Sequence, residues 1–175
     1  KGPITIDEKV YSVTYTVSNT AAADKSNAKQ TVTITNTQQD PKFTLDVTKK
    51  SAENDGENGQ QKLLAGVEFT LEKMKNDDNG KLVVDETFNK LTGVTNEHGV
   101  LMLKDNETQG FKELEAGTYR LTETKAAEDY NLLSEPITII FSKDGKCKVG
   151  ADVLTAAKPG TNYTGDAATG YTLSL

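Results

Sequence analysis

The sequence is poor in the residues that catalytic and metal sites most often need. Its 175 residues include one cysteine, one histidine and no tryptophan. The single cysteine, Cys147, excludes an internal disulfide, and its place in the turn-and-strand stretch SKDGKCKVG predicts a half-exposed, unreactive thiol. A zinc site or a serine-histidine triad would depend on His98 alone, in the turn TNEHGV. The sequence therefore argues against an enzyme with turnover and against a metal or other cofactor.

Long apolar runs and clusters of basic residues are also missing. Because no stretch of about 18 apolar residues occurs, we expect no membrane insertion in this fragment. The net charge is −6 and no basic run forms a patch, so we expect no nucleic-acid binding. A content of 35% hydrophobic and 26% charged residues indicates a folded globular chain. The chain starts at Lys1 without methionine and ends abruptly, which we interpret as an internal fragment of a longer protein.

The sequence does contain many short alternating runs rich in Thr, Val, Ile and Tyr. Turn sequences such as NDDNGK and SKDGK separate them, a combination typical of strands and tight connections. One helical turn within 107–113 is an alternative for that stretch. The pattern predicts an all-β, antiparallel β-sandwich of immunoglobulin-like type. The expected strands are 9–18, 31–37, 43–49, 67–73, 81–88, 99–103, 118–124, 136–142, 146–149 and 170–175.

The polar segment QQDPK, residues 38–42, divides the chain. It contains a proline and no periodic pattern, so it is interpreted as a linker. Two strands do not make a stable domain in water, and only two are predicted before it. We therefore expect residues 1–39 to complete a sheet of a preceding domain, or to pack against the rest, and 40–175 to form a second domain. The acidic stretch 51–62 is expected to be a solvated loop, since its spacing does not follow an EF-hand.

Three predicted strands place one polar residue on a face that is otherwise apolar. Lys49 in FTLDVTKK, Glu123 in GTYRLTETK and Asn36 in TVTITNT each lie at spacing two from apolar neighbours. Lys50 falls on the polar face and is therefore not the candidate amine. One interpretation is that each of the three residues marks a strand end and turns outward to water. The other is that an amine, a carboxyl and a carboxamide react together.

The reaction open to these groups is an amide transfer. The lysine amine attacks the asparagine side-chain carbonyl, ammonia leaves, and an isopeptide crosslink remains. Burial disfavours the charged form of a lysine and favours a protonated glutamate, which can donate a proton to the carboxamide. Holding the groups next to one another supplies further acceleration through proximity.

The segment GFKELEAGTYRLTETKAAEDY, residues 110–130, resembles the E-box region of CnaB domains, the B-type domains of collagen adhesins and Gram-positive pilins. The E-box strand there has the form GxYxLxET and leads to an APxGY-like turn. Here that turn is KAAEDY, which lacks the proline and glycine but keeps Tyr130. LLAGVEFTLEK, TNEHGVLML and PITIIFSKDGKCKV are similar to three further motifs of the family. The resemblance covers about residues 43–175 and implies a CnaB-like sandwich.

The resemblance also implies a site. In CnaB domains a first-strand lysine, the E-box glutamate and a final-strand asparagine form an isopeptide bond, so Lys49 would be the amine and Glu123 the catalyst. The final strand here is GYTLSL, with Leu175 on its inward face. The next inward position is 177, so we expect the acceptor for Lys49 just past Leu175 and a truncated final strand in this domain.

Residues 9–37 resemble the last strands of a preceding pilin domain, in which a TxTxTN strand carries the asparagine. Two outcomes are open for Asn36. In the first, it is the acceptor for a lysine located before Lys1. In the second, the strand 31–37 folds back across QQDPK and Asn36 meets Lys49. We favour the first, because a bond between residues so near in sequence closes a short loop and stabilises little.

The resemblance implies a structural module of a cell-wall-anchored pilin or surface adhesin, with isopeptide bonds that form once. Such a module would be secreted and lie in the cell wall or pilus. Its partners would be other pilin subunits, joined by sortase-type covalent assembly. The alternative is an adhesin domain that binds a host surface protein through its loops. Tyr163 in GTNYTGDAATGY is the one aromatic residue that the pattern places in such a loop.

Overall fold

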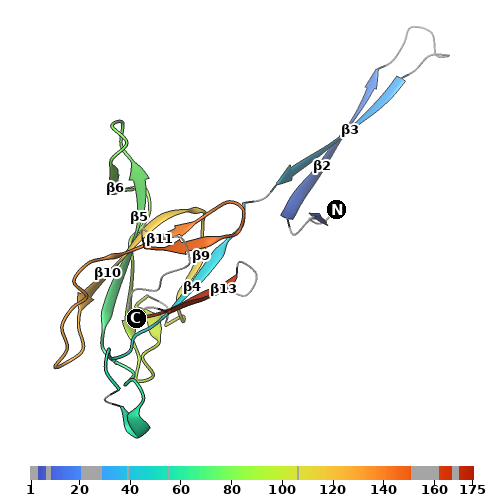
Figure 1. Cartoon of the computed structure of the whole chain (residues 1–175). Coiled ribbons are helices and arrows are strands. Elements are labelled where there is room, and N and C mark those ends of the chain that lie inside the picture. Colours follow the sequence, from blue (N-terminus) through green and yellow to red (C-terminus); the bar gives the residue numbers. More distant parts are fainter. Residues whose placement is uncertain are drawn as a thin grey trace. The chain divides into compact units, whose positions relative to one another are not determined.

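The computed structural model describes residues 4–6, 9–20, 29–38, 40–54, 56–105, 107–150, 162–166 and 170–175. The chain separates into two compact units, Lys1–Asp40 and Pro41–Leu175, and each unit has its own sheets (Figure 1). In the described stretches, no helix is long and apolar enough to span a membrane.

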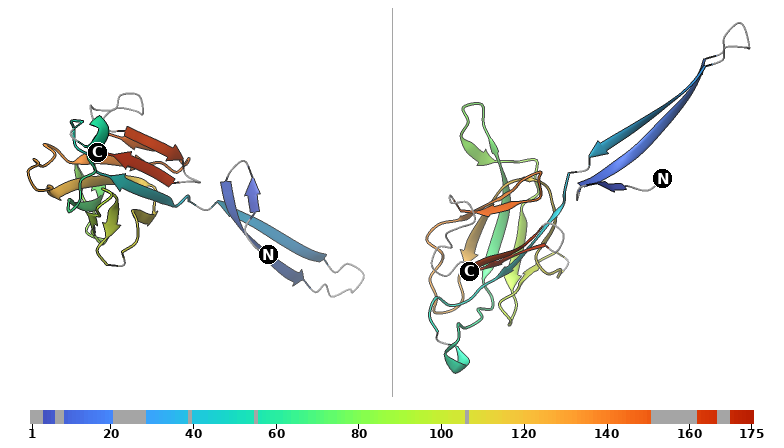
Figure 2. Two further views of the ribbon diagram at one scale, coloured as in Figure 1. Left: turned by 90° about the horizontal axis from the view of Figure 1, so that it is seen from below. Right: turned by 45° about the vertical axis from the view of Figure 1, so that its right-hand side comes forward.

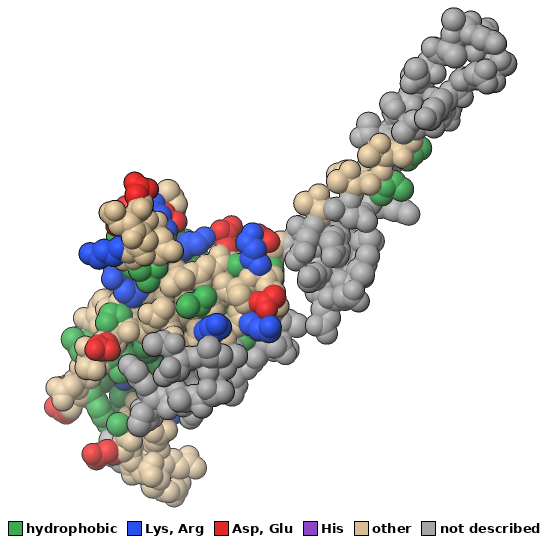
Figure 3. Space-filling view, turned by 45° about the horizontal axis from the view of Figure 1, so that its top comes forward, with side chains coloured by type: hydrophobic (Ala, Val, Ile, Leu, Met, Phe, Trp, Pro, Cys, Tyr) green, Lys and Arg blue, Asp and Glu red, His purple; other side chains and the backbone are tan. Residues whose placement is uncertain are grey.

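The first unit is a three-stranded antiparallel sheet in the order β1-β2-β3. Its strands are β1 (Ile4–Ile6), β2 (Lys9–Thr20) and β3 (Lys29–Gln38), and β2 and β3 form a long hairpin (Figures 1 and 2). Alternating threonines and aliphatic residues favour this extended backbone. Val32 and Ile34 of β3 are 57% and 66% exposed, and hydrophobic side chains show on the surface of the described part of this unit (Figure 3).

The second unit is a sandwich of two sheets. The larger sheet has the order β12-β11-β10-β5-β7-β8, with β6 also paired to β5, and the smaller has the order β13-β14-β4-β9 (Figure 2). The pairing of β14 with β4 is parallel, and the other pairs among the described strands are antiparallel. The predicted all-β sandwich is confirmed. The strands are β4 (Phe43–Thr48), β5 (Glu68–Asn76), β6 (Leu82–Val84), β7 (Leu91–Thr95), β8 (Leu101–Leu103), β9 (Phe111–Leu114), β10 (Gly117–Lys125), β11 (Ile137–Phe141), β12 (Cys147–Val149), β13 (Asn162–Asp166) and β14 (Gly170–Ser174), and the short 3-10 helix η2 is Glu57–Gly59.

Aromatic rings join the two sheets at the centre of the sandwich. Phe43 of β4 and Phe141 of β11 stack with their ring centroids 4.6 Å apart. Tyr171 of β14 and Tyr119 of β10 lie 5.7 Å and 5.8 Å from the ring of Phe141. Offset and edge-on ring pairs stabilise by more than the area they bury. The aliphatic residues around them are Leu45, Val47, Leu64, Val67, Leu71, Leu101, Leu114, Leu121, Ile139, Leu173 and Leu175.

Three local predictions were wrong. The helical turn considered within 107–113 does not form, because Phe111–Leu114 is strand β9, with Glu113 at φ 55° where its pairing with β4 is irregular. Tyr163 lies in strand β13 and not in a loop, since the stretch pairs with β14. Cys147 is 1% exposed, because β12 pairs with β11 and turns that side chain into the core.

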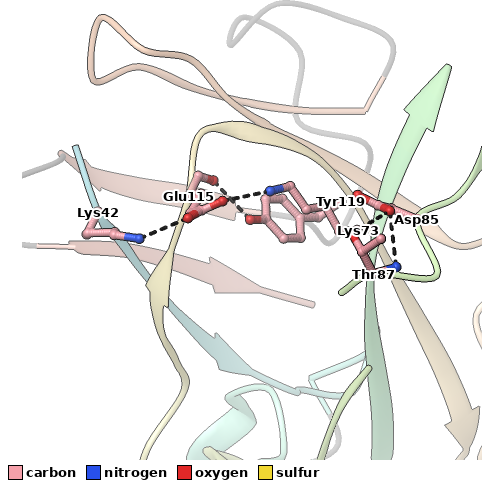
Figure 4. A network of polar contacts seen from close by, with 6 residues as sticks. All are labelled: Lys42, Lys73, Asp85, Thr87, Glu115 and Tyr119. Atoms are coloured by element: carbon pink, nitrogen blue, oxygen red, sulfur yellow. Dashed lines mark hydrogen bonds and ion pairs between the residues drawn. The ribbon is translucent and has the colours of Figure 1, made fainter. Parts of the chain in front are cut away.

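A polar network holds the corner between β9 and β10 (Figure 4). Glu115 accepts hydrogen bonds from Lys73 at 3.0 Å and from Lys42 at 3.2 Å. Both bonds lower the pKa of Glu115 from its ordinary value of 4.5, and the bond from Lys73 has the larger effect. The Tyr119 hydroxyl donates to the Glu115 carbonyl at 3.0 Å, and burial raises the pKa of Tyr119 to about 12. The network fixes the start of β10, the strand that carries the candidate carboxyl.

Candidate isopeptide site

Lys49 follows β4 and lies on its buried face, with 8% of the residue exposed. Backbone contacts fix it there. Its N–H donates to the Gly99 carbonyl at 2.8 Å, and its own carbonyl accepts from the Leu64 N–H at 3.0 Å. Gly99 has a φ of +67°, and a Cβ there would lie 2.6 Å from the Lys49 carbonyl oxygen, so the turn requires glycine. Lys50 alternates to the other side of the strand and is half-buried.

Glu123 ends the buried face of β10, after Tyr119 and Leu121. It precedes an irregularity in the ladder of β10 with β5, between Glu123 and Lys125. Its side chain is 1% exposed, and its Oε2 atom lies 3.5 Å from the Nζ atom of Lys49. The structure therefore brings together, inside the sandwich, the amine and the carboxyl that the resemblance to CnaB domains had implied as one site.

The two carboxyl oxygens of Glu123 have different surroundings. Oε2 faces Lys49 Nζ and also accepts a hydrogen bond from the backbone N–H of Leu133 at 3.3 Å. Oε1 is buried and has no hydrogen-bond partner among the described residues. Leaving a buried polar atom without a partner costs free energy, so Oε1 marks a position where a further polar group would be stabilised.

A pocket of about 410 Å³ opens beside Lys49. One wall comes from the segment after β4, and the other from the loop that follows β10. Both walls contribute polar residues to the pocket. The lining residues are Lys49, Lys50, Ser51, Ala52, Glu53, Leu64, Asp129, Tyr130, Asn131 and Leu133.

Strand β14 runs parallel to β4 and leads to this pocket. The Leu175 N–H donates to the Thr48 carbonyl at 2.8 Å, and the Leu175 carbonyl accepts from the Lys50 N–H at 2.5 Å. Tyr171, Leu173 and Leu175 all face the core. Continued alternation along the same strand direction would bring position 177 inward, next to the pocket.

Asn36 lies in the first unit, on β3, with its Cα paired to that of Val13 on β2. Its side chain is outside the described part of the structure. In the second unit β4 lies between β14 and β9, whereas β3 pairs with β2.

The described residues hold no group of three or more His, Cys, Asp or Glu side chains arranged to bind a metal ion.

The sequence did not predict one polar contact of the site, the hydrogen bond from the backbone N–H of Leu133 to Glu123. Every residue except proline offers such a donor, so no side-chain pattern could identify it. The one available signal was the unusual turn KAAEDY, because it begins the loop that returns to Glu123.

Residues 49–153 match the family described as SpaA, prealbumin-like fold domain. The chain belongs to this family, and the resemblance to CnaB-type domains is confirmed. No curated protein sequence matches the chain.

Several solved structures are similar to this chain, and the likeness to the first of them shows a shared fold. The C-terminal fragment of the pilus adhesin SpaC from Lactobacillus rhamnosus GG is 18% identical, with 97% of this chain and 69% of that chain covered and a TM-score of 0.53. BcpA, the major pilin subunit of Bacillus cereus, is 23% identical over 81% of this chain, with a TM-score of 0.47. The pilus 2b backbone protein of group B streptococcus is 17% identical, with 89% of this chain and 52% of that chain covered and a TM-score of 0.39. This chain spans 37% of the length of BcpA.

Proposed function

We propose that the second unit is a structural module of a Gram-positive pilin or surface adhesin, stapled by one isopeptide bond from Lys49 to an asparagine on the continuation of β14. The observation that carries the proposal is the buried pair of Lys49 Nζ and Glu123 Oε2, 3.5 Å apart. A buried ion pair is weak evidence for stability, because desolvation offsets its attraction. Its position at the end of β14, beside the unpartnered Oε1 of Glu123, favours a reactive site.

The bond forms in one turnover. Transfer of one proton from Lys49 Nζ to Glu123 first leaves both groups of the pair uncharged. The lone pair of the Lys49 amine then attacks the carboxamide carbon of the acceptor, while the Glu123 carboxyl donates to the carboxamide oxygen. Glu123 accepts a proton from the Lys49 nitrogen and passes one to the leaving amine. Ammonia departs as the former carboxamide oxygen returns its proton to Glu123, so one C–N bond replaces another, the amide carbonyl is restored and Glu123 ends in its starting protonation state. No cofactor takes part, and the product is the module itself.

The staple would act over nearly the whole unit. A bond from Lys49 to position 177 closes a loop that includes both sheets, and by analogy with a disulfide it stabilises by roughly 4–5 kcal/mol. An isopeptide bond also withstands reduction, which suits a chain with one cysteine. Because β4 and β14 are the first and last strands of the unit, tension along the chain would pass through the covalent bond.

The first unit has a matching role in this proposal. Residues 1–39 would be the C-terminal strands of a preceding pilin-like domain, and Asn36 would be the acceptor for a lysine of that domain. The exposure of Val32 at 57% and of Ile34 at 66% supports this, because an apolar strand face of this kind normally packs against a second sheet.

The module would be secreted and held in the cell wall or pilus, where sortase-type assembly joins it covalently to other pilin subunits. The SpaA-type fold and the likeness to a fragment of the pilus adhesin SpaC support this assignment. Recognition of a host protein through the loops has less support, since Tyr163 lies in strand β13.

Intact-mass spectrometry of the protein with β14 continued beyond Leu175 tests the bond. Each isopeptide bond releases one ammonia, so the mass should be lower by about 17 Da than the sequence mass, and a tryptic crosslink should contain Lys49. Lys50→Ala is the matched control and should keep the loss, whereas Lys49→Ala should abolish it. A wild-type protein with its full sequence mass would contradict the proposal.

A further inference from the structure

The proposed reaction needs the Glu123 carboxyl in one orientation, because its two oxygens have different tasks. One must donate a proton to the acceptor, and the other must take a proton from Lys49. A carboxyl can rotate between these arrangements unless a neighbour distinguishes the oxygens. The neighbour that does so here comes from the loop after β10, and the inference rests on the proposed function.

We infer that the backbone N–H of Leu133 is a positioning group for the isopeptide reaction, and that it directs Oε1 of Glu123 towards the acceptor. The N–H lies 3.3 Å from Oε2, ten residues along the chain from Glu123. Lys49 Nζ lies 3.5 Å from the same oxygen. Two nitrogen groups with N–H bonds therefore converge on Oε2, and this makes Oε2 the proton-accepting oxygen.

Oε1 is left as the oxygen that carries the proton. It is buried and has no hydrogen-bond partner within the described residues, so an O–H there can donate to the carboxamide oxygen of the acceptor. The Lys49 lone pair then forms the new C–N bond, Oε1 loses its proton to the carbonyl oxygen, and Oε2 takes one from Nζ. The proton on Oε2 then passes to the leaving amine and the proton on the former carbonyl oxygen returns to Oε1, which releases ammonia and restores both the amide carbonyl and the carboxyl.

The loop that carries Leu133 is held in place by packing. Ala127, Tyr130 and Leu133 pack against the core, and the Tyr130 N–H donates to the Ala127 carbonyl at 3.1 Å. The amine of Lys62 lies 6.0 Å from the centre of the Tyr130 ring, so the loop also contacts the segment on the other side of the pocket. These contacts keep the Leu133 N–H in place before the acceptor arrives.

Replacement of Leu133 by its α-hydroxy acid tests the inference. This change turns the amide into an ester, removes the N–H and keeps the side chain. In the protein with β14 continued, we expect the rate constant for ammonia loss after refolding to fall about tenfold, the change that about 1.4 kcal/mol of barrier produces. Leu132 is 51% exposed, and the same replacement there should leave the rate constant within about twofold of wild type.

The outcomes separate the two proposals. If the wild-type protein reacts and the Leu133 ester reacts equally fast, the positioning role is overturned while the isopeptide bond stands. If the wild-type protein never loses ammonia, the proposed function fails and the positioning role fails with it. Melting temperatures of both esters before reaction check that a slow rate does not come from unfolding.

Hydrogen exchange in the 175-residue chain gives a readout that needs no acceptor. Glu123→Ala should reduce protection of the Leu133 amide about tenfold, while the Tyr130 amide of the same loop, which donates to Ala127, stays protected. Unchanged protection at Leu133, or an equal loss at both amides, would overturn the specific contact with Oε2.

Discussion

Ile34 and Ile139 lie in similar strands and meet opposite surroundings. Ile34, on β3 of the first unit, is 66% exposed, whereas Ile139, on β11 of the second unit, is fully buried. β3 alternates aliphatic residues with threonine, β11 has the sequence ITIIF, and both strands pair antiparallel with a neighbour. The difference is a second sheet, which covers β11 within its unit, whereas the described strands of the first unit form one sheet. Alternation therefore predicts which residues share a face, and packing decides whether that face is buried.

The two units also divide the chemistry. The second unit holds a buried amine and a buried carboxyl 3.5 Å apart, with a carboxyl oxygen that has no partner in the described residues. The first unit carries Asn36, whose carboxamide is the kind of group that a lysine amine attacks. Asn36 lies on β3, a strand with exposed apolar residues. On the proposed function each unit contributes to a different bond, so changes in one unit should leave the bond of the other intact.

The largest expected effect comes from loss of the second unit's bond. In a protein that includes the continuation of β14, Glu123→Ala should leave the crosslink unmade and lower the free energy of unfolding by roughly 4–5 kcal/mol. Asn36→Ala should leave the Lys49 crosslink in place. Mass spectrometry of tryptic peptides, combined with chemical denaturation, measures both effects. A Lys49 crosslink that disappears with Asn36→Ala would break the division between the units.

A matched pair of isoleucines tests the packing contrast directly. Ile139→Ala should lower the free energy of unfolding by about 3 kcal/mol, because it opens a cavity in a fully buried site. Ile34→Ala in the 175-residue chain should change it by less than about 0.5 kcal/mol, since that side chain is exposed.

Denaturation followed by circular dichroism measures both isoleucine variants. In a longer protein that supplies the preceding strands, the cost of Ile34→Ala should rise towards that of Ile139→Ala. A cost that stays small there would argue against the preceding-domain proposal.

A smaller effect is expected on the outer face of the larger sheet. Arg120 Nη2 lies 2.7 Å from Glu72 Oε2, and the side chains are 38% and 22% exposed. Partly exposed pairs contribute little, so Glu72→Gln should cost about 0.5–1 kcal/mol and lose most of this cost in high salt. Figure 3 shows cationic and anionic side chains interspersed over one face of the second unit. A cost above that of Ile139→Ala would contradict the view that core packing dominates this unit.

The smallest expected effect is a change in how thermal stability depends on pH. Hydrogen bonds from Lys73 and then Lys42 lower the pKa of Glu115 from 4.5. A carboxyl whose pKa is lower in the folded state stabilises at pH values above its unfolded pKa, and this contribution is lost as the pH falls through the folded value. Thermal melts between about pH 5 and pH 3 should therefore fall less steeply for Glu115→Gln than for wild type. Parallel curves would show that the exposed network contributes nothing measurable.

The sequence alone was sufficient for the fold class and for the faces of the principal strands. Alternation in FTLDVTKK and GTYRLTETK put Lys49 and Glu123 on apolar faces, and both residues are buried. The E-box motif identified the family, and the match over 49–153 agrees with it. These features are local, because the side-chain period of a strand depends on the backbone geometry of neighbouring residues.

Other features depended on contacts between segments far apart in the sequence. The pattern missed β7 and β13 and assigned β9 a possible helical turn, since short strands with few apolar residues form only when a neighbouring strand accepts their hydrogen bonds. It also predicted a half-exposed Cys147, although pairing of β12 with β11 buries it.

Alternation in the sequence was enough to show which side chains of β4 and β10 share a face, because alternation is a property of the strand. Tertiary packing was needed to bring Lys49 Nζ to Oε2 of Glu123, the Leu133 N–H to the same oxygen, and β14 to the pocket beside them. Each of these contacts joins strands or loops from different parts of the chain. Their distances depend on how two sheets and a returning loop pack, which no local pattern encodes.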